Sequence, residues 1–218
     1  MKGKAKEREL MMSRNNEERY KYALNVASGL FLKKGIEAVK MTDIAENCGI
    51  GVASLYRHFE TKTEMVIRSG IILWEKLRVD FFEYISKKES NRTGLEDLIY
   101  DLDYFKILFD KHKLFIKFLD DFDRLMISEK IEKTKLADYE KSIVNFYEPF
   151  NESVKKGQAD GSVRKDVDIN LVYISMTHSL IAVCQKFIRG EILPGDDFSV
   201  SAEEVEKLLE LTAAYIAA

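Results

Sequence analysis

A group of polar and basic residues near position 57 carries the side-chain chemistry of a nucleic-acid contact surface. Ser54, Arg57 and His58 lie close together in the chain, and Lys62 follows four residues later. The guanidinium of Arg57 can pair in two-pronged fashion with the edge of a guanine base. Lys62 stands at the expected start of a helix, where free backbone N–H groups also favour an anion such as phosphate. Side chains of these types can contact base edges and phosphate groups.

Two short helices around a glycine-containing turn are expected to position these side chains. We expect the first helix over residues 41–48 and the second over residues 52–59, with Gly49-Ile50-Gly51 between them. Two short helices joined in this way form a helix-turn-helix. The apolar positions that would hold the motif together are Ile44, Ala45, Ile50 and Leu55.

A longer helix is expected before this motif. Its apolar residues recur with helical spacing over residues 17–34, with Asn15 or Asn16 as the N-cap. Gly35 suits the left-handed residue that follows a helix. Residues 1–16 are then a flexible arm, and its basic side chains either touch phosphate or belong to a frayed terminus.

Six further helices are expected after the motif. The first should begin at Thr61, which forms a capping box with Glu64, and end near Ser86. Turn residues separate the other five. We place them at 94–110, 112–127, 130–157, 168–190 and 201–217.

The sequence therefore predicts an all-α fold of about nine helices. Pro149 lies inside the predicted helix 130–157, where an interior proline would kink the chain near Asn145. The chain has only 2 Pro and 11 Gly in 218 residues, which disfavours sandwiches and barrels. This length buries enough surface to fold without a disulfide or metal.

Composition also bears on compartment. Cys48 and Cys184 form no disulfide or metal pattern, and the charged N-terminus lacks the apolar core of a secretory signal. No apolar run approaches the ~18–20 residues of a membrane span. These features predict a cytoplasmic protein without a membrane partner.

Charge is divided unevenly along the chain. Residues 1–68 carry 13 Lys/Arg and 9 Asp/Glu, whereas residues 69–218 carry 21 and 28. A basic first third on an acidic remainder indicates that only the first part meets a polyanion. An ordinary solvated surface is the alternative explanation.

The first part of the chain resembles the N-terminal domain of TetR-family (tetracycline-repressor-like) transcriptional regulators. The family pattern is a helix ending in Phe-x-x-x-Gly, then Ile-Ala, Gly-Val-Ser, Leu-Tyr-x-His/Tyr-Phe and Ser-Lys. A helix-turn-helix alone is a weak signal, but here the whole set occurs in order over residues 17–66. The matching residues are Leu24–Ala27, Phe31, Gly35, Ile44-Ala45, Gly49-Ile50, Leu55-Tyr56, His58-Phe59 and Thr61-Lys62.

The resemblance implies a homodimeric repressor with a helix-turn-helix domain at 17–64 and an effector-binding and dimerisation domain at 65–218. Such a repressor leaves a palindromic operator when a small apolar or amphipathic effector binds. Tyr56 and Lys62 would grip phosphate, although Tyr56 and His58 have the alternative of packing against the connecting helix. The implied DNA-contact residues are Lys40, Thr42, Val52, Ala53, Ser54, Tyr56, Arg57, His58 and Lys62.

Three positions depart from the family pattern. Gly51 replaces the usual Ser cap of the recognition helix, at a cost of a few tenths of a kcal/mol. Val52 and Ala53 replace residues that are often polar or Gly, so they offer thymine methyl contacts without hydrogen bonds. Lys40 stands where Thr or Ser usually caps the second helix. DNA binding stays the expectation, but the operator sequence does not follow from these residues.

The body of the chain is rich in aromatic residues that are either plain core or the wall of an apolar effector cavity. An effector there would shift the helix over residues 61–86 and so change the distance between the two DNA-binding domains. The predicted effector-contact residues are Trp74, Phe105, Phe109, Phe115, Phe118, Phe122, Tyr147, Phe150, Tyr173 and Met176.

The resemblance also implies that the last two long helices form a four-helix bundle with a second copy. The same apolar residues have the alternative of packing within one subunit. The predicted dimer residues are Val172, Ile174, Ser175, Ile181, Ala182, Val205, Leu208, Leu209, Leu211 and Tyr215.

Two other classes of protein have less support in the sequence. An enzyme is disfavoured because there is no catalytic triad pattern, phosphate loop or nucleotide fingerprint. The run Asp120-Asp121-Phe122-Asp123 lacks a metal-loop pattern, so neither metal nor cofactor is predicted. A helical interaction protein that has lost DNA binding is the second alternative, supported only by Gly51, Val52 and Ala53.

Overall fold

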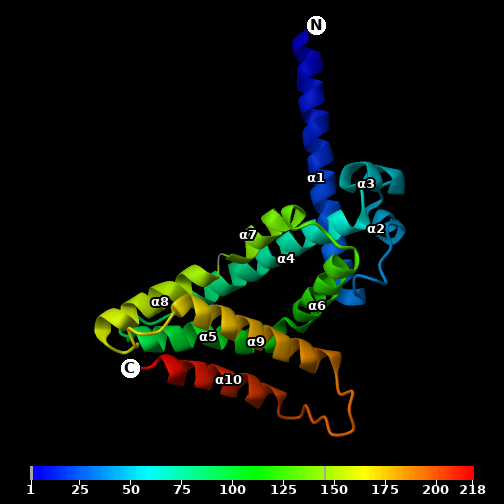
Figure 1. Ribbon diagram of the computed structural model, residues 1–218. Coiled ribbons are helices and arrows are strands. Elements are labelled where there is room, and N and C mark those ends of the chain that lie inside the picture. Colours follow the sequence, from blue (N-terminus) through cyan, green and yellow to red (C-terminus); the bar gives the residue numbers. More distant parts are fainter. Residues whose placement is uncertain (1, 145) are drawn as a thin grey trace. The chain divides into compact units, whose positions relative to one another are not determined.

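The computed structural model describes residues 2–144 and 146–218, and over these residues the fold is all-α without a strand (Figure 1). This confirms the predicted fold class. The helices are α1 (Lys2–Lys34), α2 (Met41–Cys48), α3 (Val52–Phe59), α4 (Lys62–Ile85), α5 (Gly94–Lys111), α6 (Lys113–Ser128), the 3-10 helix η1 (Lys133–Leu136), α7 (Ala137–Val144), α8 (Tyr147–Asp160), α9 (Ile169–Arg189) and α10 (Ser201–Ile216).

The helices form two compact units. Unit 1 comprises residues 1–74 and 121–139, and unit 2 comprises residues 75–120 and 140–218. The predicted domain boundary between residues 64 and 65 falls in the first turn of α4, which continues from one unit into the other as one helix.

Unit 1 has an apolar core built from α1, α2, α3 and α4. Ala23, Ala27 and Phe31 recur every four residues along α1, so one face of this helix is buried. From α3, Leu55 and Phe59 pack inward and are fully buried. This core fixes which side of α3 remains outside.

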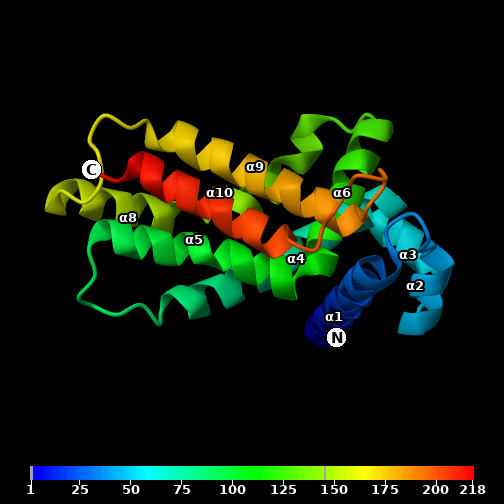
Figure 2. The same ribbon diagram turned by 90° about the horizontal axis from the view of Figure 1, so that it is seen from below.

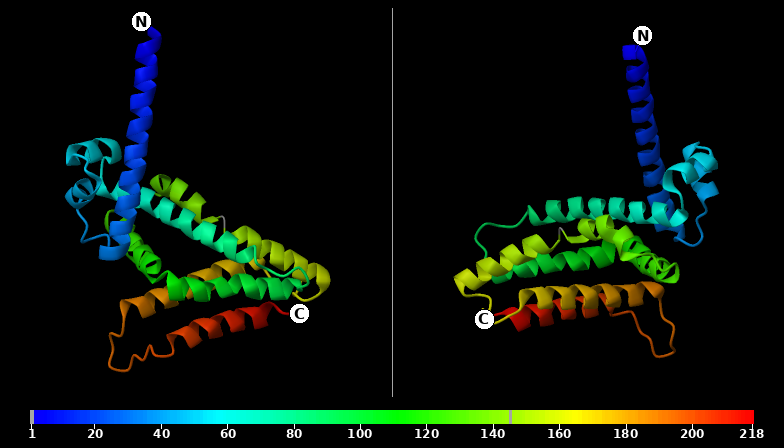
Figure 3. Two further views of the ribbon diagram at one scale, coloured as in Figure 1. Left: turned by 180° about the vertical axis from the view of Figure 1, so that it is seen from behind. Right: turned by 45° about the horizontal axis from the view of Figure 1, so that its top comes forward.

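Unit 2 is a set of packed helices in which α5 runs beside both α8 and α10, and α10 runs beside α9 (Figures 2 and 3). Helices α5 and α8 approach each other closely at Gly94, where an added Cβ would collide with the backbone of Gly157. An added Cβ at Gly157 would collide with the side chain of Val163. Thr93 caps α5, accepting a hydrogen bond from the Glu96 N–H at 3.2 Å. The first free N–H of α5 also donates to Asp160 at 2.7 Å.

A buried polar network reinforces the same helix pair. The Lys88 ammonium lies 2.6 Å from a carboxylate oxygen of Asp101, and the Ser153 hydroxyl donates to the other oxygen at 2.6 Å. Burial raises the pKa of Asp101, while the bonds from Lys88 and Ser153 act in the opposite direction. Lys156 pairs with Asp97 at 2.7 Å. Because breaking one partner of such a pair strands a buried charge, the network favours one register of α5 against α8.

The predicted start of the first helix at Glu17 is wrong, because α1 begins at Lys2. Residues 4–12 are almost all strong helix formers, and no proline interrupts them. The side chains of residues 1–15 lie outside the described part of the chain. The phosphate contacts predicted for the basic residues there are therefore untested. The N-cap predicted at Asn15 or Asn16 is wrong, because both residues lie inside α1.

The predicted single helix over residues 130–157 is also wrong. This segment contains η1, then α7, then α8, and the break falls between Val144 and Tyr147. Pro149 occupies the third position of α8, where its missing N–H has no intrahelical partner to lose. Proline therefore lies near the start of a helix instead of kinking its interior. Asn145, the expected bend, is outside the described residues.

Candidate nucleic-acid interface

The turn between α2 and α3 sets the direction of α3. Gly49 adopts left-handed φ 63° and donates its N–H to the carbonyls of Ala45 and Glu46. Ile50 turns inward and is buried. Gly51 is the N-cap of α3 and offers no side-chain bond, as expected for glycine in place of serine. The bounds predicted for both helices, 41–48 and 52–59, are confirmed to the residue.

The outward side of α3 carries several of the predicted contact residues. Val52, Ala53, Tyr56 and Arg57 are exposed. The guanidinium of Arg57 donates to the Ser54 hydroxyl at 3.2 Å, which brings two predicted contact residues together. Because Leu55 and Phe59 hold the opposite side in the core, these polar groups point into solvent.

His58 does not stand free on this surface. Its ring stacks on Tyr20 of α1 with centroids 3.6 Å apart and planes within 6°, and it meets Phe59 edge-on at 4.6 Å. Burial, and then the nearby Arg68 charge, lower the pKa of His58 below its ordinary 6.5. The ring of His58 therefore packs on α1, whereas the predicted alternative was the connecting helix, and the residue stays exposed to solvent.

The His58 stack predicts a pH dependence of stability. Because the folded state lowers the pKa of His58, the unfolded chain binds the proton more readily, and stability falls as pH drops through 6.5. His58→Phe keeps an aromatic ring on Tyr20 and removes the titration. We expect the unfolding temperature of the parent protein to fall more between pH 7.5 and pH 5.5 than that of the variant. Equal pH slopes in the two proteins would contradict this assignment.

The remaining predicted contacts lie at helix starts. Lys40 and Thr42 are exposed at the beginning of α2, and the Lys40 N–H donates to Asp43 at 2.8 Å. Lys62, in the first turn of α4, directs its ammonium to the Glu37 carbonyl at 3.3 Å. Partial burial lowers the pKa of Lys62. This hydrogen bond connects the start of α4 to Glu37, in the segment between α1 and α2. A phosphate contact by Lys62 would be additional.

The joint between α3 and α4 is a tight γ-turn. Glu60 has φ 59° and ψ −53°, and the Thr61 N–H donates to the Phe59 carbonyl at 2.5 Å. The Thr61 hydroxyl then caps α4 by accepting the Glu64 N–H at 3.0 Å, as predicted. The Glu64 carboxylate bonds to Arg68 at 2.6 Å. A short joint of this kind fixes the angle between α3 and α4.

The predicted effector residues fall into separate groups. In unit 1, Phe122 stacks on Tyr139 with centroids 4.2 Å apart, and Tyr139 hydrogen-bonds to Trp74. In unit 2, Tyr147 and Phe150 each lie 5.0 Å from the Tyr173 ring, and burial raises the pKa of Tyr173 to about 12. The others in unit 2 are buried or half-buried, namely Phe105, Phe109, Phe115, Phe118 and Met176.

The predicted dimer residues also divide. Val205 and Leu209 are buried, which agrees with the alternative that these residues pack within one subunit. Val172, Ile181 and Leu208 are half-buried. The other predicted dimer residues are exposed, and they share their surface with Leu171 and His178, which were not predicted. The helical spacing of these two residues with Ile174 and Ala182 could have indicated them. We call this surface the α9–α10 face, and it comprises Leu171, Ile174, Ser175, His178, Ala182, Leu211 and Tyr215.

Two further findings concern α9 and the acidic run. By length and composition α9 is apolar enough to cross a membrane, with only 17% of the relevant window buried. The expectation that no segment reaches this level is wrong, because uncharged polar residues interrupt the apolar run without lowering its mean hydropathy much. Among the described residues no cluster suits a metal ion. Asp120 from the acidic run instead pairs with Arg189 at 2.6 Å.

Comparison with known proteins agrees with the helix-turn-helix geometry. Residues 23–68 match the family described as bacterial regulatory proteins, tetR family. The chain is 28% identical over 152 residues to the HTH-type transcriptional repressor KstR2 of Rhodococcus jostii, covering 69% of this chain and 70% of the relative. The KstR2 of Mycolicibacterium smegmatis is 27% identical over 158 residues, with the same coverage.

Solved structures share the fold. A transcriptional regulator from Saccharomonospora viridis in complex with choline superposes with a TM-score of 0.66 at 16% identity, covering 93% of this chain and 99% of that one. The ketosteroid transcriptional regulator KstR2 of Mycobacterium tuberculosis has a TM-score of 0.53 at 21% identity, with coverage of 92% and 95%. At these identities the likeness establishes the fold alone.

Proposed function

Because the chain is a member of the TetR family of DNA-binding transcriptional regulators, we propose that it is a homodimeric repressor of a palindromic operator. A small apolar or amphipathic effector would release it from that operator. The family and its relatives are regulators and not enzymes, in agreement with the expectation from the sequence. The relatives are bacterial regulators, and we place this chain in the cytoplasm with them.

The exposed side of α3 is the observation that supports DNA binding most directly. A helix of two turns, held by Leu55 and Phe59, presents Tyr56 and Arg57 to solvent. A recognition helix needs this arrangement to enter the major groove. In our proposal Arg57 reads a guanine and Val52 and Ala53 contact thymine methyl groups.

The helix starts would position the protein on the phosphate backbone. Lys40, Thr42 and Tyr56 are exposed and can reach phosphate oxygens. Lys62 contributes charge beside the free N–H groups of α4. We assign His58 a positioning role, since its ring is stacked on Tyr20.

The α9–α10 face supports the dimer. It contains large apolar side chains that are open to solvent in one protomer, including Ile174 at 49% and Leu211 at 60% exposure. Contiguous exposed apolar surface on two neighbouring helices is typical of a protein interface. A two-fold dimer through this face would also account for the apolar surface of α9. Its recognition helices would need to lie ~34–36 Å apart to enter successive major grooves.

The dimer proposal predicts the effect of charge on this face. Ile174→Glu combined with Leu211→Glu places four carboxylates in a two-fold interface, so we expect the variant to sediment as a monomer at micromolar concentration. Val79→Glu changes an apolar residue that is 59% exposed on α4, outside this face, and should leave the dimer intact. A dimer that survives the double substitution would contradict the assignment.

We place the effector against the aromatic residues of unit 2 around Tyr173. Tyr147 and Phe150 of α8 and Met176 of α9 offer apolar contacts around the half-buried Tyr173 ring. The neighbour from Saccharomonospora binds choline, and KstR2 is named for ketosteroids, so the fold accepts chemically different ligands. Because α4 is continuous between the units, a ligand that shifts it would weaken DNA binding; such coupling needs only ~1–3 kcal/mol.

Selection of random duplex DNA on the purified protein tests the function. We expect an enriched inverted repeat whose affinity falls steeply with salt, because phosphate contacts release counterions. Recovery of no enriched sequence would favour the alternative of a helical interaction protein. A ligand that raises the unfolding temperature but leaves operator affinity unchanged would overturn the effector part alone.

A further inference from the structure

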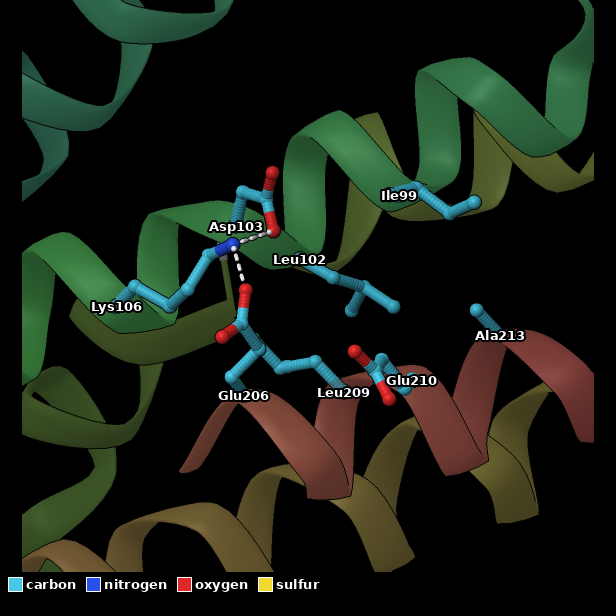
Figure 4. A pocket seen from close by; sticks show the side chains of 8 residues that line it. All are labelled: Ile99, Leu102, Asp103, Lys106, Glu206, Leu209, Glu210 and Ala213. Carbon is cyan, nitrogen blue, oxygen red and sulfur yellow. Dashed lines mark hydrogen bonds and ion pairs between the residues drawn. The ribbon is translucent and has the colours of Figure 1, made fainter. Parts of the chain in front are cut away.

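A surface pocket between α5 and α10 lies apart from the DNA and effector residues proposed above. It has a volume of about 300 Å³, and all its lining residues come from these two helices (Figure 4). This volume is at the lower end of those that bind small molecules. The pocket lies entirely within unit 2, so its geometry depends on one compact body.

The floor of the pocket is apolar. Leu102 of α5 and Leu209 of α10 are buried and form its base, and Ala213 leaves space because it has only a methyl group (Figure 4). Ile99 borders this space and remains 39% exposed. An alkyl chain lying here would cover apolar surface that is now in contact with water.

The rim of the pocket is acidic. Asp103, Glu206 and Glu210 supply three carboxylates, and two cations pair with them. Lys106 is itself a lining residue, and Lys207 of α10 forms an ion pair with Glu210. The Lys106 ammonium lies 2.8 Å from Asp103 and 3.4 Å from Glu206, and the bond to Asp103 raises the pKa of Lys106. This pair of carboxylates from two helices already holds an ammonium group above the apolar floor.

We propose that this pocket binds a small organic monocation, an alkylammonium whose chain covers the Leu102–Leu209 floor and whose head group contacts Glu206 and Glu210. With three carboxylates against the ammonium groups of Lys106 and Lys207, the rim stays net negative and selects against an anion of the same shape. Leu211 and Tyr215 of the α9–α10 face lie on the other side of α10, because successive helical residues are 100° apart. The proposed site therefore does not depend on the proposed dimer, operator or effector.

Calorimetric titration of the full chain with hexyltrimethylammonium tests the site. We expect saturable binding with one site per protomer, no detectable binding of hexanoate, and weaker binding of neutral hexanol. Equal affinity for hexanol and the cation would overturn the assignment, because the carboxylates would then contribute nothing. Absence of any binding of the cation would overturn it as well.

Substitutions of the acidic and the basic residues of the pocket should change the affinity for the cation in opposite directions. A merely structural role of these residues would not produce this result. Glu206→Gln combined with Glu210→Gln should weaken the cation about five-fold, since each exposed ion pair contributes modestly. Lys106→Gln removes the competing ammonium and should tighten the cation about three-fold. Glu203→Gln removes an exposed carboxylate of α10 outside the pocket and serves as the matched control. If all three charge changes in the pocket weakened binding, the proposal would fail.

Blocking the space locates the ligand. Ala213→Phe fills the pocket with a ring and should abolish binding of hexyltrimethylammonium. Its thermal unfolding curve should stay cooperative, because Ala213 is only partly buried. Undiminished binding to a folded Ala213→Phe variant would place the cation elsewhere and overturn the inference.

Discussion

Gly94→Ala should lower the free energy of unfolding by about 3 kcal/mol or more, although alanine is the better helix former. A Cβ at position 94 would lie 1.9 Å from the Gly157 nitrogen and 2.2 Å from its Cα. Both atoms belong to backbone, so no side-chain rotation relieves the collision and α5 must move away from α8. For a chain of this size the loss corresponds to about 10 °C in unfolding temperature.

Two controls separate this collision from general effects of glycine replacement. Gly29→Ala adds a Cβ within α1 that meets no atom within 4 Å, so it should be neutral or stabilise by about 0.5–1 kcal/mol. At Gly157 the nearest atom to an added Cβ is a side-chain carbon of Val163 at 2.4 Å. Gly157→Ala with Val163→Ala should therefore be less destabilised than the sum of the single changes. A Gly94→Ala protein as stable as its parent would show that α5 and α8 are not so closely packed.

The close approach of α5 and α8 also shows what sequence could not predict about the fold. Gly94 and Gly157 are far apart in the chain, and neither sits in a local pattern that names its partner. By contrast, Gly49 and Gly51 mark both ends of the turn between α2 and α3, so those helices were predicted to the residue. Turn and capping residues determine where helices end, whereas the pairing of helices depends on contacts between residues far apart in the chain.

The break in the predicted helix 130–157 illustrates a second limit. Its apolar spacing continues across the break, and Phe146, which precedes α8, is not a capping residue. Pro149 was therefore interpreted as an interior kink when it lies in the first turn of α8. A proline can mark either a kink inside a helix or the first turn of a new helix. A capping residue just before it would have distinguished the two.

The candidate DNA surface was largely predictable from the sequence because its residues lie within one short stretch, residues 40–62. The exception is His58, whose environment depends on Tyr20, a residue of another helix. The pocket between α5 and α10 could not be predicted from the sequence for the same reason. Its carboxylates on α5 and α10 are joined only through Lys106, whose ammonium bridges Asp103 and Glu206. Side chains that meet across helices leave no spacing signal.

Arg57→Ala should weaken binding to the selected operator about 10- to 100-fold, the value of one lost two-pronged base contact. The Arg57 side chain is exposed and donates a hydrogen bond to the Ser54 hydroxyl on the same helix, so the unfolding temperature should not change. The loss should be accompanied by relaxed preference at one base pair in each half-site. Gel-shift titration against the operator and its single-base variants measures both effects.

Lys40→Ala gives the contrasting behaviour of a phosphate contact. Binding should weaken by a similar factor for every sequence, and the slope of log affinity against log salt should fall by about 1 per protomer. Lys155→Ala, an exposed cation of α8, controls for net charge and should leave both quantities unchanged. If Arg57→Ala instead weakened all sequences equally, Arg57 would hold phosphate and another residue of α3 would read the base. If neither Arg57→Ala nor Lys40→Ala altered binding, α3 would not be the element that enters the groove.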